Sequence, residues 1–182
     1  MEATIKIPKA LHEVHGHESS VTDVLLAHSL AVASTITVFW LSAAHLHTWQ
    51  EILLGILTYD LVGGVVANFS RSTSSFYAAS SKKRRGFLLL HLLQPTLLTL
   101  VFMEYLQTIL PICTYILVSS AIVNAMQASN RQVMTGAFFS VLGIFLLQIP
   151  FFEASPVLEF LLTVFLLKLP LAWAVRWYEL KK

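Results

Sequence analysis

Charge is scarce in this chain. Only 12% of its 182 residues are Asp, Glu, Lys or Arg, about half the share of an average soluble domain. Hydrophobic residues make up 56%, and the mean hydropathy is +0.71. A soluble protein of this size would expose much of that apolar surface to water. The composition therefore excludes an ordinary soluble domain and predicts an all-α, polytopic integral membrane protein.

Cysteine is nearly absent, and several catalytic motifs are missing. Cys113 is the single cysteine, so an intrachain disulfide is excluded and a cysteine-based metal site is disfavoured. The sequence has no phosphate-binding loop, nucleophile elbow or dinucleotide fingerprint. No feature favours nucleic-acid binding. The first 20 residues lack the basic start and short apolar core of a signal peptide, and we expect them to be retained.

Long apolar runs give the predicted organisation. A bilayer core about 30 Å thick needs roughly 20 apolar residues per helix. That length predicts a six-helix membrane domain over residues 21–178, between a cytoplasmic segment, 1–20, and a cytoplasmic tail, 179–182. The six predicted helices cover residues 21–44, 49–69, 86–106, 109–126, 132–149 and 157–178.

Lysine and arginine are missing from alternate loops. The loops after the first, third and fifth predicted helices contain none, so the positive-inside rule places both termini in the cytoplasm. Five or seven helices would break this pattern. Eleven of the twelve basic residues fall on the predicted cytoplasmic side: Lys6, Lys9, Arg71, Lys82, Lys83, Arg84, Arg85, Arg131, Arg176, Lys181 and Lys182.

Asp60 is the most informative single residue. It precedes Phe69, the end of its predicted helix, by about 13 Å at ~1.5 Å per residue, which is near the bilayer midplane. Its helix face continues through Gly64, Ala67 and Asn68, so small and polar residues share one stripe. A carboxylate at that depth needs a partner, water or a proton. It is a candidate proton- or ligand-binding group, or an acid that only fixes helix packing.

His91, Gln94 and Pro95 share one face of the third predicted helix. Proline removes a backbone donor and clashes with the carbonyl four residues earlier, that of His91. This predicts a bend and a polar pocket, in which His91 would titrate or bind a metal. The alternative is an interface histidine that bonds a neighbouring helix.

Lys168 is the one basic residue outside the cytoplasmic set. It lies about nine residues from the inner end of the last predicted helix, too deep for snorkelling to bring its ammonium fully out. Asp60 lies at a similar depth, so we predict an ion pair between them. Glu159 is the rival partner, but the spacing places it on the opposite helix face.

Other polar residues are weaker candidates. His28 and Asn124 fall in the cytoplasmic half and, with Asn68, His91 and Gln94, would line an inward-facing cavity. A lone histidine such as His28 is more often a packing residue. The N-terminal histidines form a loose metal-binding tract without a catalytic signature, and solvated histidines are the simpler interpretation. The weak metal candidates are thus His28, His91, His12, His15 and His17.

A basic cluster, Arg71 with Lys82, Lys83, Arg84 and Arg85, would hold its loop on the cytoplasmic side and attract anionic lipid headgroups. An alternative adds Asn68 and nearby hydroxyls to make a site for an acidic or phosphate-bearing ligand.

Three functions remain open from the sequence. The first is a small-solute carrier or substrate-binding membrane subunit, proton-coupled through Asp60 or His91, with ligand contacts at Asn68, Gln94, Asn124 and Lys168. The second is an embedded enzyme that acts on a lipid or isoprenoid at the cytoplasmic interface, with Asp60 or His91 as acid, base or metal ligand. The third is a non-catalytic lipid-binding protein or partner of another membrane protein. No cofactor is specified, and homo-oligomers are compatible with each function.

Overall fold

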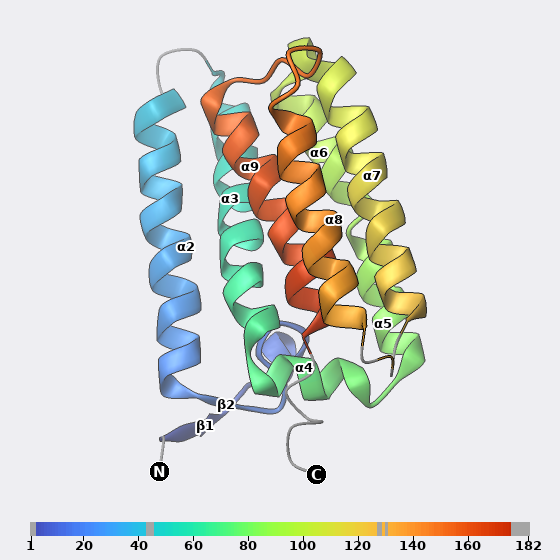
Figure 1. Cartoon of the computed structure of the whole chain (residues 1–182). Helices are drawn as coiled ribbons and strands as arrows, with labels where there is room; N and C mark the ends of the chain where they lie inside the picture. The colour runs from blue at the N-terminus through green and yellow to red at the C-terminus, as the bar shows by residue number, and fades with distance from the viewer. Residues whose placement is uncertain (1–2, 43–45, 127–128, 130, 176–182) are drawn as a thin grey trace.

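The computed structural model describes residues 3–42, 46–126, 129 and 131–175. The long helices stand side by side with roughly parallel axes (Figure 1). They are α2 (Val21–Ser42), α3 (Thr48–Phe69), α7 (Leu106–Ala125), α8 (Gln132–Leu147) and α9 (Pro156–Leu166). The predicted all-α class is confirmed, apart from one short pair of strands.

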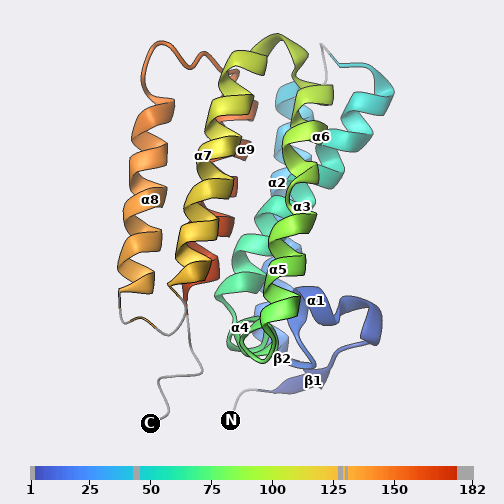
Figure 2. The ribbon, with the colours of Figure 1, turned by 90° about the vertical axis from the view of Figure 1, so that its right-hand side faces the viewer.

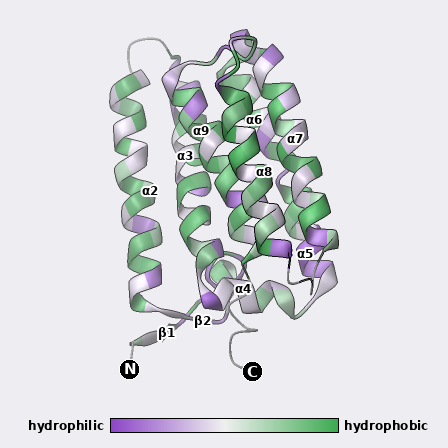
Figure 3. Cartoon of the chain, viewed as in Figure 1, coloured by the Kyte–Doolittle hydropathy of each residue, from purple (hydrophilic) through white to green (hydrophobic). Residues whose placement is uncertain are grey.

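Four helical stretches are long and apolar enough to cross a membrane. They are Val21–Ser42, Thr48–Phe69, Met103–Ala125 and Pro156–Ala174, and Gln132–Leu147 is a shorter apolar helix. Figure 3 shows hydrophobic residues along most of each helix, while hydrophilic residues gather at the end of the bundle beside α4 and α5. The predicted first helix ends at Ser42 in the structure, and residues 43–45 lie outside the described ones.

The segment expected as one helix over 86–106 is divided. α5 (Ser81–Leu90) begins earlier, and α6 (Leu93–Val101) continues it after a turn at His91 and Leu92 (Figure 2). Pro95 lies in the first turn of α6, where a missing backbone N–H is harmless. The helix thus breaks one turn before the proline. A 3₁₀ turn, η2 (Met103–Tyr105), then leads into α7, which starts before the expected residue 109.

The last helical rod is also irregular. α9 passes into the π-helical segment η3 (Leu167–Leu171) and the 3₁₀ turn η4 (Ala172–Ala174). Pro170 cannot donate to the carbonyl of Leu166, four residues earlier. The Ser140 hydroxyl of α8 donates to that carbonyl instead, at 2.8 Å. The last helical rod ends at Ala174 and Val175 is extended, so it stops short of the expected residue 178; residues 176–178 lie outside the described ones.

The N-terminal segment folds back under the bundle. β1 (Thr4–Lys6) pairs antiparallel with β2 (Glu18–Ser20), and η1 (Lys9–Leu11) and α1 (His12–His15) lie between them. Gly16 ends α1 with φ of 72°, a left-handed conformation that glycine adopts without strain. The expected polar loop after α3 contains another short helix, α4 (Arg71–Ala78).

The apolar core fills the half of the bundle that is distant from α4. Leu54 of α3, Leu98 of α6, Ile109 of α7 and Leu158 of α9 are all fully buried there. In a membrane the alternative surrounding is lipid, so these side chains stabilise the bundle through close packing. Asn68 of α3, His91 at the end of α5 and Lys168 of η3 are buried polar residues in the other half.

Candidate functional site

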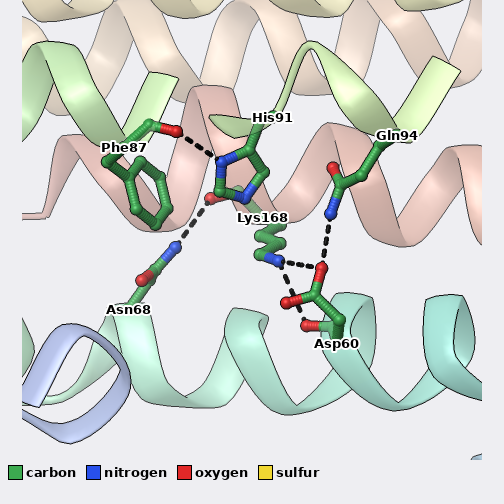
Figure 4. A network of polar contacts seen from close by, with 6 residues as sticks. All are labelled: Asp60, Asn68, Phe87, His91, Gln94 and Lys168. Atoms are coloured by element: carbon green, nitrogen blue, oxygen red, sulfur yellow. Dashed lines mark hydrogen bonds and ion pairs between the residues drawn. The ribbon is translucent and has the colours of Figure 1, made fainter. Parts of the chain in front are cut away.

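Asp60 and Lys168 form an ion pair, as the sequence predicted. The Lys168 ammonium lies 2.7 Å from Oδ2 of Asp60 and also donates to the Asp60 backbone carbonyl at 3.1 Å (Figure 4). The Lys168 side chain is 2% exposed, and that of Asp60 is 53% exposed. The pair therefore joins a buried cation to an accessible anion. The rival, Glu159, instead accepts a hydrogen bond from Gln148.

Gly64 makes room for the lysine. A Cβ atom at this position would overlap the Lys168 Cε and lie 2.8 Å from its Nζ. The Lys168 backbone is held from the same helix, because Asn68 Nδ2 donates to the Lys168 carbonyl at 3.4 Å. The predicted stripe of small and polar residues on α3 thus lies against the π-helical segment of the last rod.

Gln94 and His91 meet this pair from the divided helix. The Gln94 amide donates to Oδ2 of Asp60, so that oxygen accepts from both Gln94 and Lys168. His91 Nδ1 lies 2.7 Å from the carbonyl of Phe87. The His91 ring also packs on Phe87, with 4.2 Å between ring centroids. Neither His91 Nε2 nor Gln94 Oε1 has a hydrogen-bond partner among the described residues.

A cavity of about 250 Å³ lies beside the ion pair. Its polar wall contains Asp60, Asn68, His91 and Lys168, four of the six ligand-binding residues that the sequence predicted. Gln94 lines a second cavity of about 170 Å³, which shares Asp60 and His91 with the first. Asn124 lines neither cavity, and the structure does not bring it to the site.

The N-terminal segment covers the larger cavity. His15 of α1 is buried, and its Nε2 lies 3.1 Å from Nε2 of His28 on α2. His28 Nδ1 in turn lies 2.5 Å from the hydroxyl of Tyr59 on α3. These three residues all line the cavity. The sequence suggested His15 only as a weak metal ligand, and His28 as a weak metal ligand and a residue of the cavity lining. It did not indicate that α1 folds onto the site.

Two hydrogen bonds hold α1 in place. The hydroxyl of Tyr77 donates to the Glu13 carbonyl at 2.8 Å, and that of Thr73 donates to the Val14 carbonyl at 2.7 Å. Burial, with a smaller contribution from the carboxylate of Glu13, raises the pKa of Tyr77, so its hydroxyl stays protonated. Burial also lowers the pKa of His15, nearby His28 lowers it further, and Asp23 opposes both.

The five candidate metal ligands form two separate pairs and one single histidine. His12 Nδ1 lies 3.1 Å from Nδ1 of His17, and His15 lies beside His28, while His91 stands apart at the ion pair. In the part of the chain that the structure describes, no group of three or more His, Cys, Asp or Glu side chains is arranged to hold a metal ion.

The basic cluster lies at the start of α5 and on α4. Lys83 Nζ lies 3.5 Å from the centroid of the Phe76 ring, a cation–π contact. Arg84 donates to the carbonyls of Tyr77 and Ala78, each at 3.3 Å, and so caps α4. Lys82, Arg85 and Arg71 are exposed. Arg84 therefore has a structural function in addition to the predicted headgroup contact.

Comparisons with known proteins do not identify a relative. No protein-family model matches the chain, and no curated protein or solved structure matches it significantly. The function must therefore be argued from the cavity and its side chains.

Proposed function

We propose that the chain crosses the membrane six times, with both termini in the cytoplasm. The passes are α2, α3, α5 with α6, α7, α8, and α9 with η3 and η4. The charge pattern supports this topology, since the basic residues of α4 and α5 lie at the same end of the bundle as the N-terminal segment (Figures 1 and 2). Cysteines introduced at Ser81 and Glu104 test it, because only the latter is expected to react with an impermeant thiol reagent outside the cell.

The proposed function is binding of a small amphiphilic molecule that enters from the lipid phase. One observation carries it: the Asp60–Lys168 pair forms part of the wall of a cavity whose lining includes exposed residues. Asp60, Tyr59 and Leu90 line the cavity and are also exposed. Charged groups near the membrane midplane are costly, and where they occur they usually mark a functional site. The protein therefore acts as a substrate-binding membrane subunit.

The Asp60–Lys168 pair itself offers the test. The double substitution Asp60→Asn with Lys168→Met removes both charges and keeps the site electrically balanced, so the fold is retained. Protein purified in native lipid is compared with the variant by mass spectrometry of retained small molecules. We expect one amphiphile to be depleted at least tenfold in the variant.

Glu159→Gln is the matched control. Glu159 is also a carboxylate bonded to a glutamine, but it does not line the cavity. This control is expected to retain the molecule at the wild-type level. Equal retention in wild type and the double variant, or no retained molecule in either, contradicts the proposal.

A catalytic function is the second candidate, and one observation favours it. His91 Nε2 is a buried ring nitrogen without a described partner at the cavity wall, a suitable position for a general base. If the site is catalytic, the retained molecule is converted over time by wild type but not by His91→Phe. Proton-coupled transport remains the sequence-based alternative, and pH-driven uptake into proteoliposomes tests it.

A further inference from the structure

Two buried hydrogen-bond acceptors at the site have no described partner. His91 is 4% exposed and Gln94 is 6% exposed, and His91 Nε2 and Gln94 Oε1 are both unpaired among the described residues. Buried polar atoms are seldom left unpaired, because each costs about 1–3 kcal/mol. Both acceptors therefore call for a hydrogen-bond donor, and a ligand is one source.

The chemistry of His91 Nε2 follows from its other ring nitrogen. Nδ1 bonds the carbonyl of Phe87, and a carbonyl only accepts hydrogen bonds. Nδ1 must therefore carry the proton, which leaves the lone pair of a neutral ring on Nε2. Figure 4 shows this ring between Phe87 and Lys168, on the same side of the site as Gln94. The ligand group beside His91 must be an O–H or N–H donor.

Charge at the site selects among donors. Asp60 and Lys168 already neutralise each other at 2.7 Å. An ammonium head would leave one net positive charge in a low-dielectric environment, and a carboxylate head would leave one net negative charge. A hydroxyl head donates to His91 and adds no charge.

The second cavity has room for an apolar chain. It lies between α3 and α6, and its aliphatic lining includes Ile56, Leu57, Leu93 and Leu97. Asp60, Leu90 and His91 line both cavities, so the polar and apolar regions meet at the ion pair. Ile56 and Leu93 are exposed on the flank of the bundle, where a hydrocarbon chain would continue into the bilayer.

We infer that the ligand is a neutral long-chain alcohol, whose hydroxyl donates to His91 Nε2 and whose chain lies between α3 and α6. This inference rests on the proposed amphiphile-binding function and specifies its chemical class. The unpaired Nε2 of His91 determines the head, and the aliphatic cavity determines the tail.

The test uses the full chain in lipid nanodiscs with ¹⁵N-labelled histidine. The probes are 1-dodecanol, dodecyl methyl ether, which has no donor, and dodecanoate, which is anionic. Dodecanol is expected to shift the His91 Nε2 resonance saturably, and the ether is expected not to shift it. His17, which is exposed, and His12, which is half-buried, lie outside both cavities and are internal controls that should not respond.

Calorimetric titration against empty nanodiscs gives the matching affinities. At equal mole fraction in the membrane, the ether is expected to bind wild type about fivefold more weakly than the alcohol, the effect of one lost hydrogen bond. In His91→Phe, which keeps a ring on Phe87, this preference is expected to fall to about one.

The outcomes separate the inference from the proposed function. A shift with dodecanoate but not with dodecanol overturns the alcohol and leaves an amphiphile site. Equal responses to alcohol and ether, or an unchanged preference in His91→Phe, overturn the hydrogen bond to His91. The absence of binding by all three probes overturns both the inference and the proposed amphiphile site.

Discussion

The two halves of the Asp60–Lys168 pair are expected to respond unequally to mutation. Lys168 is buried and Asp60 is half-exposed, so the consequence depends on which charge is left behind. Asp60→Asn leaves a buried ammonium without a counter-charge. Lys168→Met leaves a carboxylate that lines the cavity, where it can be hydrated or accept a proton.

The magnitude can be bounded. Removing one partner of a buried pair costs about 3–5 kcal/mol. Neutralising a free lysine at pH 7 costs about 4.6 kcal/mol, because its usual pKa is ~10.4 and each pH unit is ~1.36 kcal/mol. We therefore expect Asp60→Asn to lower the free energy of unfolding by about 3–4 kcal/mol. For Lys168→Met the loss is expected to be smaller, about 1–2 kcal/mol, because the remaining carboxylate lines the cavity, where it can be hydrated or take a proton.

The double variant completes the thermodynamic cycle. With both charges removed, the free energy of unfolding is expected to return to within about 1 kcal/mol of wild type. Reversible unfolding in mixed micelles, followed by far-ultraviolet circular dichroism, measures all four proteins. Equal losses in the two single variants would refute the unequal burial, and a double variant as unstable as Asp60→Asn would refute the charge argument.

Three further predictions concern the packing around the site. Gly64→Ala should displace Lys168 and lower the free energy of unfolding by about 1–3 kcal/mol. The control Gly86→Ala should leave the free energy of unfolding unchanged or raise it, because an added Cβ there has no atom within 4 Å. Ser140→Ala should lower the free energy of unfolding by about 1–3 kcal/mol, because the buried Leu166 carbonyl loses its side-chain donor. An unfolding transition equal to that of wild type would contradict this. Burial lowers the pKa of His15 when α1 is packed on the bundle, so His15 binds a proton more readily when the N-terminal segment is released. The packed position of α1 is therefore stable above pH ~6.5, the usual pKa of histidine, and becomes less stable as the pH falls below that value. Hydrogen-exchange protection factors over residues 3–20, corrected for the pH dependence of the intrinsic exchange rate, should fall between pH 7.5 and pH 5 in wild type and not in His15→Gln. Equal protection factors at the two pH values would argue against this loosening.

Several features of the site could be predicted from local sequence. The depth of Asp60 and of Lys168 follows from counting residues along apolar helices, and two opposite charges at one depth in lipid are expected to pair. His91 and Gln94 are three residues apart, so a helix places them on one face. Pro95 indicated a helix break nearby, although the break lies one turn earlier, at His91 and Leu92.

Other features depend on contacts between distant segments. His15 reaches His28 and Tyr59 only because the chain reverses between β1 and β2 and returns under the bundle. Gly64 is one of several small residues on α3, and only the approach of the π-helical segment makes it the space that Lys168 occupies. The sequence predicted Asn124 in the cavity from its depth along the helix. Depth does not determine whether a residue faces the cavity, and Asn124 lines neither cavity.

The sequence by itself determined the class of protein and the two charges that are expected to meet, because residue type and depth along a helix show which charges need a partner in lipid. The tertiary structure decided that one charge is buried and the other accessible, that α1 covers the cavity, and that His91 Nε2 is left without a described partner. Those properties depend on how helices rotate and pack against each other, which no single helix specifies.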